Sequence, residues 1–521
     1  MKEIKYLILI ILLVCYPSLS LYAHNLFESS IQSAYFPLLI SAVFGVSVYL
    51  LVRLVLKDSA KSFIMASTVI LFFFLYGHIY QLYSSRKLAQ FLPVSENLVL
   101  FSVIGLILIL LIILLKKTDK LQTIVSSYIV FIGILLVSVL FFIIPNQLEE
   151  IVKRQQLANF IHSTNPKVEI NNKTVGSYPD IYYIIFDRYA RADILKKYFN
   201  FDNLPHISYL KNQGFSVNES AYANYPTTYL SLASSLNMQH LTWLEKLMGE
   251  SYKNRWIVYA ELLNKNFVAV ALKNMGYKYY FFGSSWEGTE QSDIADKNFN
   301  AFENIDQFST YIYENTALNA FFGMVANKQS FMGVTNLVKN VENEALKRDS
   351  IPQVAAIPGP KFVFAHFLTP HPPNVVDQNC NTVAFETLRK QTEEKNYTNE
   401  LQCANLIMKE LAEKIAKKSK RPYVIIFQSD EGPYLPKRYF DDQSMPNPMT
   451  DTSLEIHSKI LLAIKTSDGS IKAPKTPVNI FPLVFNNYFG SSIKTKNDRS
   501  YIAPNHDRPY DFMDVTSQVK N

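Results

Sequence analysis

Residues 179–193 read PDIYYIIFDRYARAD, which is the first motif of the globular part of the chain. Its run IYYIIF is rich in β-branched and aromatic residues and has the length of a buried strand, which we predict to end at Asp187. The next residues, ADILKKYF, favour a helix. Ligands of α/β sheets bind beyond the carboxyl ends of the strands, so Asp187 is a candidate ligand. An ordinary helix cap is the alternative for this side chain.

Three further apolar runs lie next to side chains that can bind a metal or transfer a proton. The run FVFAHFL is followed by TPHPP with His371, YVIIFQ is followed by Asp430 and Glu431, and KILLAIK is preceded by His457. Two adjacent acids repel one another, and a divalent cation relieves that repulsion. A solvated turn is the alternative for the acid pair, and a structural or exposed histidine is the alternative for His457.

The stretch YPTTYLSLASSLN supplies a hydroxyl at the expected start of a helix, at Thr227 or Thr228. Unpaired backbone N–H groups at a helix N-terminus favour an anion beside such a hydroxyl. The commoner alternative is a plain threonine N-cap. Together with the carboxylates and imidazoles, the hydroxyl forms a coherent site. Such ligands suit Zn, Mn or Mg, and a metal-bound threonine hydroxyl becomes a nucleophile.

The amino-terminal part of the chain is a series of apolar stretches within residues 1–146. Most have the length of about 20 residues that a helix needs to cross a bilayer. The first could instead be a cleaved signal peptide. The predicted spans are Lys5–Tyr22, Tyr35–Leu56, Phe63–Tyr83, Leu98–Leu115 and Ile124–Ile144.

The lysines and arginines between the spans predict the orientation. One set of loops holds eight of them: Lys2, Lys5, Arg53, Lys57, Lys61, Lys116, Lys117 and Lys120. The other set holds Arg86 and Lys87. The positive-inside rule then puts the N-terminus in the cytoplasm and, after five spans, the C-terminal domain outside a plasma (inner) membrane. A disulfide between Cys380 and Cys403 is permitted there, although the sequence does not show whether they are bridged.

Composition limits the classes of partner that we expect for this chain. A net charge of +7 over 521 residues is mild, and no arginine-rich block is present, so we expect no nucleic-acid partner.

We predict a transmembrane domain over residues 1–146, a juxtamembrane connector over 147–178 and a catalytic domain over 179–521. Apolar strands alternate there with helical patterns, which is typical of an α/β fold. In the connector, LEEIVKRQQLANFIHS favours a helix along the membrane surface.

These motifs resemble those of the alkaline phosphatase and sulfatase superfamily, above all its membrane-anchored branch of lipoteichoic acid synthases and lipid A phosphoethanolamine transferases. FDRYARAD resembles the first metal-ligand motif of that branch. TTYLSLASSLN resembles its nucleophile motif and selects Thr228, while TPHPP and QSDEGPY resemble its Ser-His-Gly-Pro and Ser-Asp-His-Gly segments. The resemblance implies five transmembrane helices, then an extracytoplasmic α/β domain whose mostly parallel sheet has helices on both faces.

Two departures from the family pattern matter. Glu431 stands where the family usually has histidine, which predicts a shift from Zn towards Mn or Mg, or a weaker site. Loss of the metal, and with it a non-catalytic membrane-anchored pseudoenzyme, is therefore one alternative. The second departure is the loop YPTTY, which lacks the cysteine and arginine of sulfate-ester hydrolases. Sulfate hydrolysis does not fit these residues.

The resemblance implies a membrane-bound metalloenzyme with a phospho-threonine intermediate. We expect a phosphoethanolamine- or glycerophosphate-type group to pass from a membrane phospholipid to an envelope glycan or lipid. A phosphodiesterase, phosphatase or sulfatase-type ester hydrolase is the alternative. The expected catalytic residues are Thr228 and His371. The expected metal ligands are Asp187, Thr228, Asp430, Glu431 and His457.

Overall fold

The computed structural model describes residues 2–85, 95–164, 178–301, 307–326, 331–434, 450–505 and 507–520. The chain divides into two compact units, and neither is continuous in sequence. The first, called here the helical unit, comprises Met1–Glu150 and Glu303–Leu337. The second, called the sheet unit, comprises Ile151–Phe302 and Val338–Asn521. The chain therefore passes between the units at three points.

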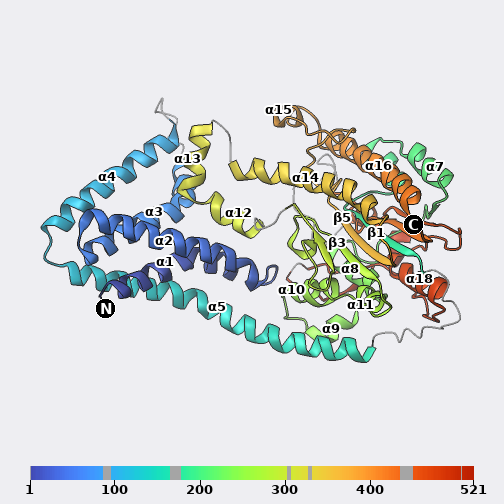
Figure 1. Cartoon of the computed structure of the whole chain (residues 1–521), viewed down its shortest axis with the longest axis horizontal. Coiled ribbons are helices and arrows are strands. Elements are labelled where there is room, and N and C mark those ends of the chain that lie inside the picture. Colours follow the sequence, from blue (N-terminus) through green and yellow to red (C-terminus); the bar gives the residue numbers. More distant parts are fainter. Residues whose placement is uncertain are drawn as a thin grey trace. The chain divides into compact units, whose positions relative to one another are not determined.

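The helical unit is built around helices that are long and apolar enough to cross a membrane, and the described residues contain five of them (Figure 1). They are α1 (Lys2–His24), α2 (Tyr35–Leu56), α3 (Ser59–Ser85), α4 (Glu96–Lys117) and α5 (Leu121–Thr164). A short 3₁₀ turn, η1 (Ile31–Ala34), precedes α2. These helices confirm the predicted spans. Arg86 and Lys87, which counted in the predicted orientation, lie outside the described residues.

Two more helices belong to the helical unit although they come from the middle of the chain. They are α12 (Gln307–Glu314) and α13 (Ala317–Ala326). In sequence they lie between the sheet strands β4 (Lys297–Phe299) and β5 (Lys361–Phe367). The sequence pattern did not assign this region.

The predicted juxtamembrane helix is the last part of α5 and is not a separate element. Leu157 is fully buried in the core of the sheet unit, and the ring of Phe160 stacks on Trp243 with 4.4 Å between centroids. Lys153 donates a hydrogen bond to the backbone oxygen of Leu247 at 3.1 Å. The polar part of the expected connector, residues 165–177, lies outside the described residues.

The sheet unit contains, among the described residues, a seven-stranded sheet in the order β2-β7-β6-β1-β5-β3-β4. The strands not yet introduced are β1 (Asp180–Phe186), β2 (Ser216–Val217), β3 (Lys278–Phe282), β6 (Tyr423–Gln428) and β7 (Leu462–Thr466). Across the sheet, β6 and its neighbours β1, β5, β3 and β4 run parallel to one another. The strand β7 is antiparallel to β6, and β2 is antiparallel to β7. A small antiparallel pair, β8 (Tyr501–Ile502) and β9 (Met513–Asp514), follows.

Helices cover both faces of this sheet, as predicted (Figure 1). Alternate residues of β1 enter two different hydrophobic cores: Tyr183 faces the core beneath α8, whereas Ile184 faces the core beneath α16. Burial on both faces explains why the strands read as continuous apolar runs. The helix α14 (Phe331–Val354) begins in the helical unit and continues into the sheet unit from Val338. The other helices of the sheet unit are α6 (Ala192–Phe199), α7 (Leu204–Asn212), α8 (Thr228–Leu236), α9 (Trp243–Met248), α10 (Trp256–Val258), α11 (Phe267–Asn274), α15 (Phe385–Leu388), α16 (Glu393–Lys418), α17 (Asp451–Ser458), α18 (Ile480–Phe489) and α19 (Thr516–Lys520).

Candidate active site

Asp187 follows the central strand β1 directly. Its backbone N–H donates to the oxygen of Phe367 at 2.9 Å, which fixes the residue against the neighbouring strand β5. The next residue, Arg188, has a φ of 59°, so the chain turns sharply at the carboxyl edge of the sheet. Burial alone would raise the pKa of Asp187, but the nearby His371, His366 and Arg188 lower it below its ordinary value.

The acid pair follows β6, the neighbour of β1 on its other side, so parallel strands bring Asp430 beside Asp187. Ser429 fixes this turn because its hydroxyl accepts from the N–H of Tyr189 at 2.8 Å and donates to the oxygen of Glu431 at 2.6 Å. Burial raises the pKa of Asp430 to about 7, and the charge of Asp187 adds to the rise. Two buried carboxyl groups this close together, those of Asp187 and Asp430, favour a bound cation or a shared proton.

Gly432 lets this turn approach α17 closely. A Cβ at this position would lie 1.9 Å from the backbone oxygen of Ile456, which leaves no room for any side chain. The N–H of Gly432 donates to the oxygen of His457 at 2.7 Å. Glycine is therefore required here by space, because α17 closes over the turn that carries Asp430 and Glu431.

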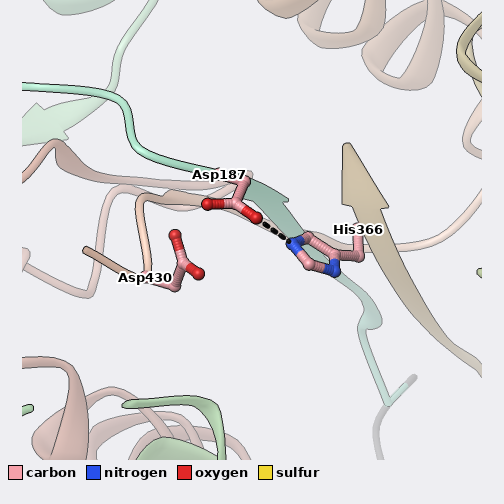
Figure 2. Close-up of side chains that lie close together, drawn as sticks. All are labelled: Asp187, His366 and Asp430. Atoms are coloured by element: carbon pink, nitrogen blue, oxygen red, sulfur yellow. Dashed lines mark ion pairs between the residues drawn. The ribbon is translucent and has the colours of Figure 1, made fainter. Parts of the chain in front are cut away.

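His366 is a site residue that the sequence analysis missed. It lies on β5, is fully buried and points its Nε2 at the Oδ2 of Asp187 from 3.4 Å (Figure 2). Its Nδ1 shares a 2.6 Å hydrogen bond with the hydroxyl of Thr289, which in turn contacts the hydroxyl of Ser284 at 2.8 Å. The available signal was a lone histidine inside the wholly apolar run FVFAHFL, since a buried imidazole needs partners.

Asp187, His366 and Asp430 form a compact cluster among the described residues. Each offers one potential ligand atom, and these atoms all lie within 4.8 Å of one another (Figure 2). Three buried atoms of this cluster have no hydrogen-bond partner within the described part of the chain: Asp187 Oδ1, Asp430 Oδ2 and His366 Nε2. When Nδ1 of His366 donates to Thr289, an Nε2 lone pair faces a carboxylate, and a cation between them removes the repulsion. Two carboxylates and one imidazole thus fit a divalent metal.

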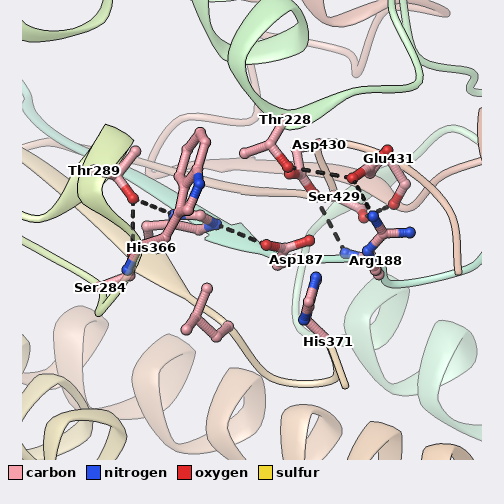
Figure 3. Close-up of polar contacts among 12 residues, drawn as sticks. Asp187, Arg188, Thr228, Ser284, Thr289, His366, His371, Ser429, Asp430 and Glu431 are labelled. Carbon is pink, nitrogen blue, oxygen red and sulfur yellow. Dashed lines mark hydrogen bonds and ion pairs between the residues drawn. The ribbon is translucent and has the colours of Figure 1, made fainter. Parts of the chain in front are cut away.

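Thr228 is the first residue of α8, and it lies beside the acid pair of Asp430 and Glu431 (Figure 3). Its hydroxyl donates to Oε1 of Glu431 at 3.3 Å. The same oxygen lies 2.9 Å from Nη2 of Arg188, whose guanidinium stacks on the Tyr434 ring at 3.7 Å. Burial raises the pKa of Glu431, and Arg188 opposes that rise. The structure thus brings Glu431, a predicted metal ligand, into a buried ion pair.

The two predicted histidines lie at different depths. His371 is partly buried, and its Nδ1 contacts the oxygen of Pro372. Burial lowers its pKa, and the charge of Asp187 opposes that shift. His457, on α17, is almost fully buried against Tyr434 and has its pKa lowered to about 3 by burial and by Arg188. Neither histidine belongs to the compact cluster that the described residues form.

A disulfide supports the segment after His371. Cys380 and Cys403 are bridged, with their Cα atoms 5.0 Å apart, so the question that the sequence left open is answered in this structure. The bridge ties the loop that follows TPHPP to α16. Stable disulfides are typical of oxidising compartments.

A family model described as Sulfatase matches residues 179–470. No curated protein matches the chain. The C-terminal periplasmic domain of EcEptC from Escherichia coli has 14% sequence identity and a TM-score of 0.39, with 68% of this chain and 97% of that chain covered.

Two further solved structures are similar to this chain. For the lipooligosaccharide phosphoethanolamine transferase A (EptA) of Neisseria meningitidis, the identity is 11%, the TM-score is 0.35 and 88% of each chain is covered. For the phosphonate monoester hydrolase of Agrobacterium radiobacter, the identity is 13% and the TM-score is 0.36, with 62% of this chain and 80% of that chain covered.

Proposed function

Since the chain belongs to the sulfatase family, we propose that it transfers a phospho-group from a membrane phospholipid to an envelope glycan or lipid. It is an enzyme of a superfamily of metal-dependent transferases and hydrolases. The transferred group is of the phosphoethanolamine or glycerophosphate type, and Thr228 carries it as a covalent intermediate. One observation carries this proposal: the Thr228 hydroxyl lies at a helix N-terminus and donates to Glu431, beside the cluster of Asp187, His366 and Asp430.

The metal in this proposal is held by Asp187, His366 and Asp430, because their ligand atoms converge and are otherwise unsatisfied. A bound divalent cation would lower the pKa of a nearby hydroxyl and offset charge on the phospho-group. An imidazole together with two carboxylates favours Zn or Mn over Mg. The Thr289 hydroxyl fixes the His366 ring from behind, as outer hydrogen bonds do for metal-ligating histidines.

Thr228 is the nucleophile in this scheme. Its Oγ1 attacks phosphorus, the bond from phosphorus to the lipid alcohol breaks, and a phospho-threonine forms. The proton of Thr228 passes to Oε1 of Glu431, which already accepts it as a hydrogen bond. An acceptor hydroxyl then attacks the same phosphorus and breaks its bond to Thr228. The proton of the acceptor replaces the one given to the leaving alcohol, and Glu431 returns its proton to Oγ1 of Thr228. The positive end of the helix dipole at the N-terminus of α8 favours the negative charge of the intermediate.

Arg188 is suited to hold the oxygens of the phospho-group. Its Nε and Nη1 are buried and have no hydrogen-bond partner within the described part of the chain, whereas Nη2 is held by Glu431. Guanidinium groups bind phosphate through paired N–H donors. His371, which lies near Asp187, is the better candidate to protonate the leaving alcohol. His457 is less suited, because its pKa of about 3 keeps it neutral.

The side of the membrane is part of the proposal. The count of lysines and arginines and the Cys380–Cys403 bridge both support an extracytoplasmic active site. The substrate class follows from this proposed location, since the spans tether the catalytic domain to a membrane that contains phospholipids. We therefore propose a membrane phospholipid as donor and an envelope saccharide or lipid as acceptor.

The test is the intact mass and metal content of the purified full-length protein after incubation with mixed phospholipids. The expected result is bound divalent metal and an added mass that maps to Thr228, whose size identifies the transferred group. Thr228→Ala should lose the adduct, whereas the adjacent Thr227→Ala is the matched control and should keep it. Rapid release of alcohol and phosphate without any acceptor would replace transfer by hydrolysis. A metal-free protein without adduct would instead support the pseudoenzyme.

A further inference from the structure

The hairpin of α12 and α13 has the composition of a membrane-associated segment. Over Gln307–Ala326 the only charged residue in the sequence is Glu314, and the segment is rich in Phe and Tyr. The ten residues of α13 amount to about 15 Å of helix, which is too short to cross a bilayer core of ~30 Å. The segment is therefore not a sixth span, and its apolar surface needs another environment.

One face of the hairpin packs into the helical unit. Phe308 of α12 is buried in a cluster with Tyr22 and Leu26 at the end of α1, Ala34 before α2, and Ile143 of α5. Ile312, one turn further along α12, packs against the same cluster. Because these partners belong to helices that are apolar enough to span a membrane, α12 is an integral part of that unit.

The turn of the hairpin is fixed to a spanning helix by backbone contact. The N–H of Gly77 in α3 donates to the oxygen of Asn315 at 2.9 Å. A Cβ on Gly77 would lie 2.9 Å from the Cα of Asn315, so only glycine allows this approach. The helix α13 that follows packs against α3 and α4.

The opposite face of α13 exposes large apolar side chains. Phe321 is 50% exposed, Phe322 is 40% exposed and Leu318 is 39% exposed. The rings of Phe321 and Phe322 meet edge to face at 6.0 Å. Exposed apolar residues also cover the spanning helices that α13 packs against, for example Leu75 of α3 and Leu98 of α4. The exposed face of α13 therefore consists of large apolar side chains like those that cover these candidate membrane spans.

We propose that α13 is an interfacial anchor, with Leu318, Phe321 and Phe322 inserted among the lipid chains at the boundary between headgroups and hydrocarbon. The occupant of this face is the bilayer itself. Aromatic side chains concentrate at that depth, and an apolar segment too short to cross the bilayer is typical of an interfacial position. The preceding helix α12 contacts the end of α1 and the start of α2, which places the hairpin on the side of the bilayer where the loop between these two spans emerges.

The test uses the full-length protein in lipid nanodiscs and does not depend on turnover. Cys15, the free cysteine of the chain, is replaced by alanine, and Phe321→Cys is labelled with a fluorophore. Lipids brominated along their acyl chains quench probes that contact them. We expect quenching at position 321 of at least roughly half that of a mid-span label, which Val137→Cys of α5 provides. Leu204→Cys on α7 is the matched control, because this leucine is also about half exposed but belongs to the sheet unit.

Quenching at position 321 no stronger than at position 204 would overturn the proposal. Disulfide-linked dimers of Phe321→Cys, formed without lipid quenching, would assign the face to a second copy of the chain and would also overturn it. Leu318→Cys is a second, independent labelling site if the Phe321 variant does not fold. Since no substrate is involved, the result is separate from the outcome for Thr228.

Discussion

Arg188 and Glu431 form a buried ion pair, with 2.9 Å between Nη2 and Oε1 and side chains that are 6% and 3% exposed. The pair joins two turns of the site, because Arg188 follows β1 and Glu431 follows β6. A buried pair is sensitive to loss of one partner, since the remaining charge stays in a dry environment. The glutamate that departs from the family pattern thus has a partner that it is suited to hold.

Glu431→Gln should leave metal binding intact and impair turnover. Glu431 lies outside the cluster of Asp187, His366 and Asp430, so the metal content should match that of the unaltered protein. Asp430→Asn is the matched change inside the cluster and should lose metal. Elemental analysis of both proteins checks this. Loss of metal in Glu431→Gln equal to that in Asp430→Asn would make Glu431 a ligand after all.

Thr289→Val should weaken metal binding without removing a ligand. The variant deletes the 2.6 Å hydrogen bond that holds the His366 ring. Loss of such outer bonds costs roughly 10–100-fold in metal affinity. Competition with a chelator measures the change. Thr398→Val is the control, because the hydroxyl of that buried threonine donates to the backbone oxygen of Lys395 in its own helix.

Gly432→Ala should abolish activity and lower the melting temperature. Its Cβ would meet the backbone oxygen of Ile456 at 1.9 Å, so either the acid turn or α17 must move. Gly133→Ala, where the added carbon has no neighbour within 4 Å, should be neutral or slightly stabilising. Thermal melts and turnover measurements on both variants test this prediction. A fully active Gly432→Ala would contradict the geometry.

Glu400 should make the sheet unit less stable at alkaline pH. Burial raises the pKa of this carboxyl from 4.5 to about 8. The folded state therefore holds a proton that the unfolded state releases, and this stability is fully present below about pH 4.5 and is lost as the pH rises through about 8. Glu400→Gln should flatten the decline of the melting temperature between pH 6 and 8. Exposed Glu386→Gln should leave the decline unchanged.

Removal of the disulfide should destabilise the sheet unit. Cys380 and Cys403 are 23 residues apart, and closing a loop of that length stabilises a fold by about 3 kcal/mol in the chain-entropy model. A double change to serine should lower the melting temperature and make the protein insensitive to reductant. Cys15→Ser, which removes no bridge, serves as the control. An equal melting temperature for all three proteins would contradict this prediction.

Much of the fold could be predicted because its signals are local. Spanning helices and doubly buried strands are continuous apolar runs, and parallel strands carry Asp187 and Asp430 to the same edge. His366 was missed because a histidine within FVFAHFL looks like part of a hydrophobic core. Its partner Thr289 lies in a region of weak motifs, 77 positions away in sequence. Such a contact follows from strand order, which no local pattern contains.

The pairing of Glu431 was hidden for the same reason. Arg188 is part of a quoted motif, yet nothing in FDRYARAD indicates that its guanidinium reaches the turn after another strand. The hairpin of α12 and α13 was hidden differently. It is too short to register as a span, and its aromatic residues resemble those of an ordinary core.

The three passages of the chain between the units affect how the protein can be produced. A recombinant fragment that starts near Ile151 would still carry residues 303–337. Phe308 and Ile312 would then lack Tyr22, Leu26 and Ala34, and their apolar surface would be open to water. We expect such a fragment to aggregate or to require detergent, although its remaining sequence reads as that of a soluble domain. A water-soluble version would have to lack this internal segment as well as the amino-terminal helices.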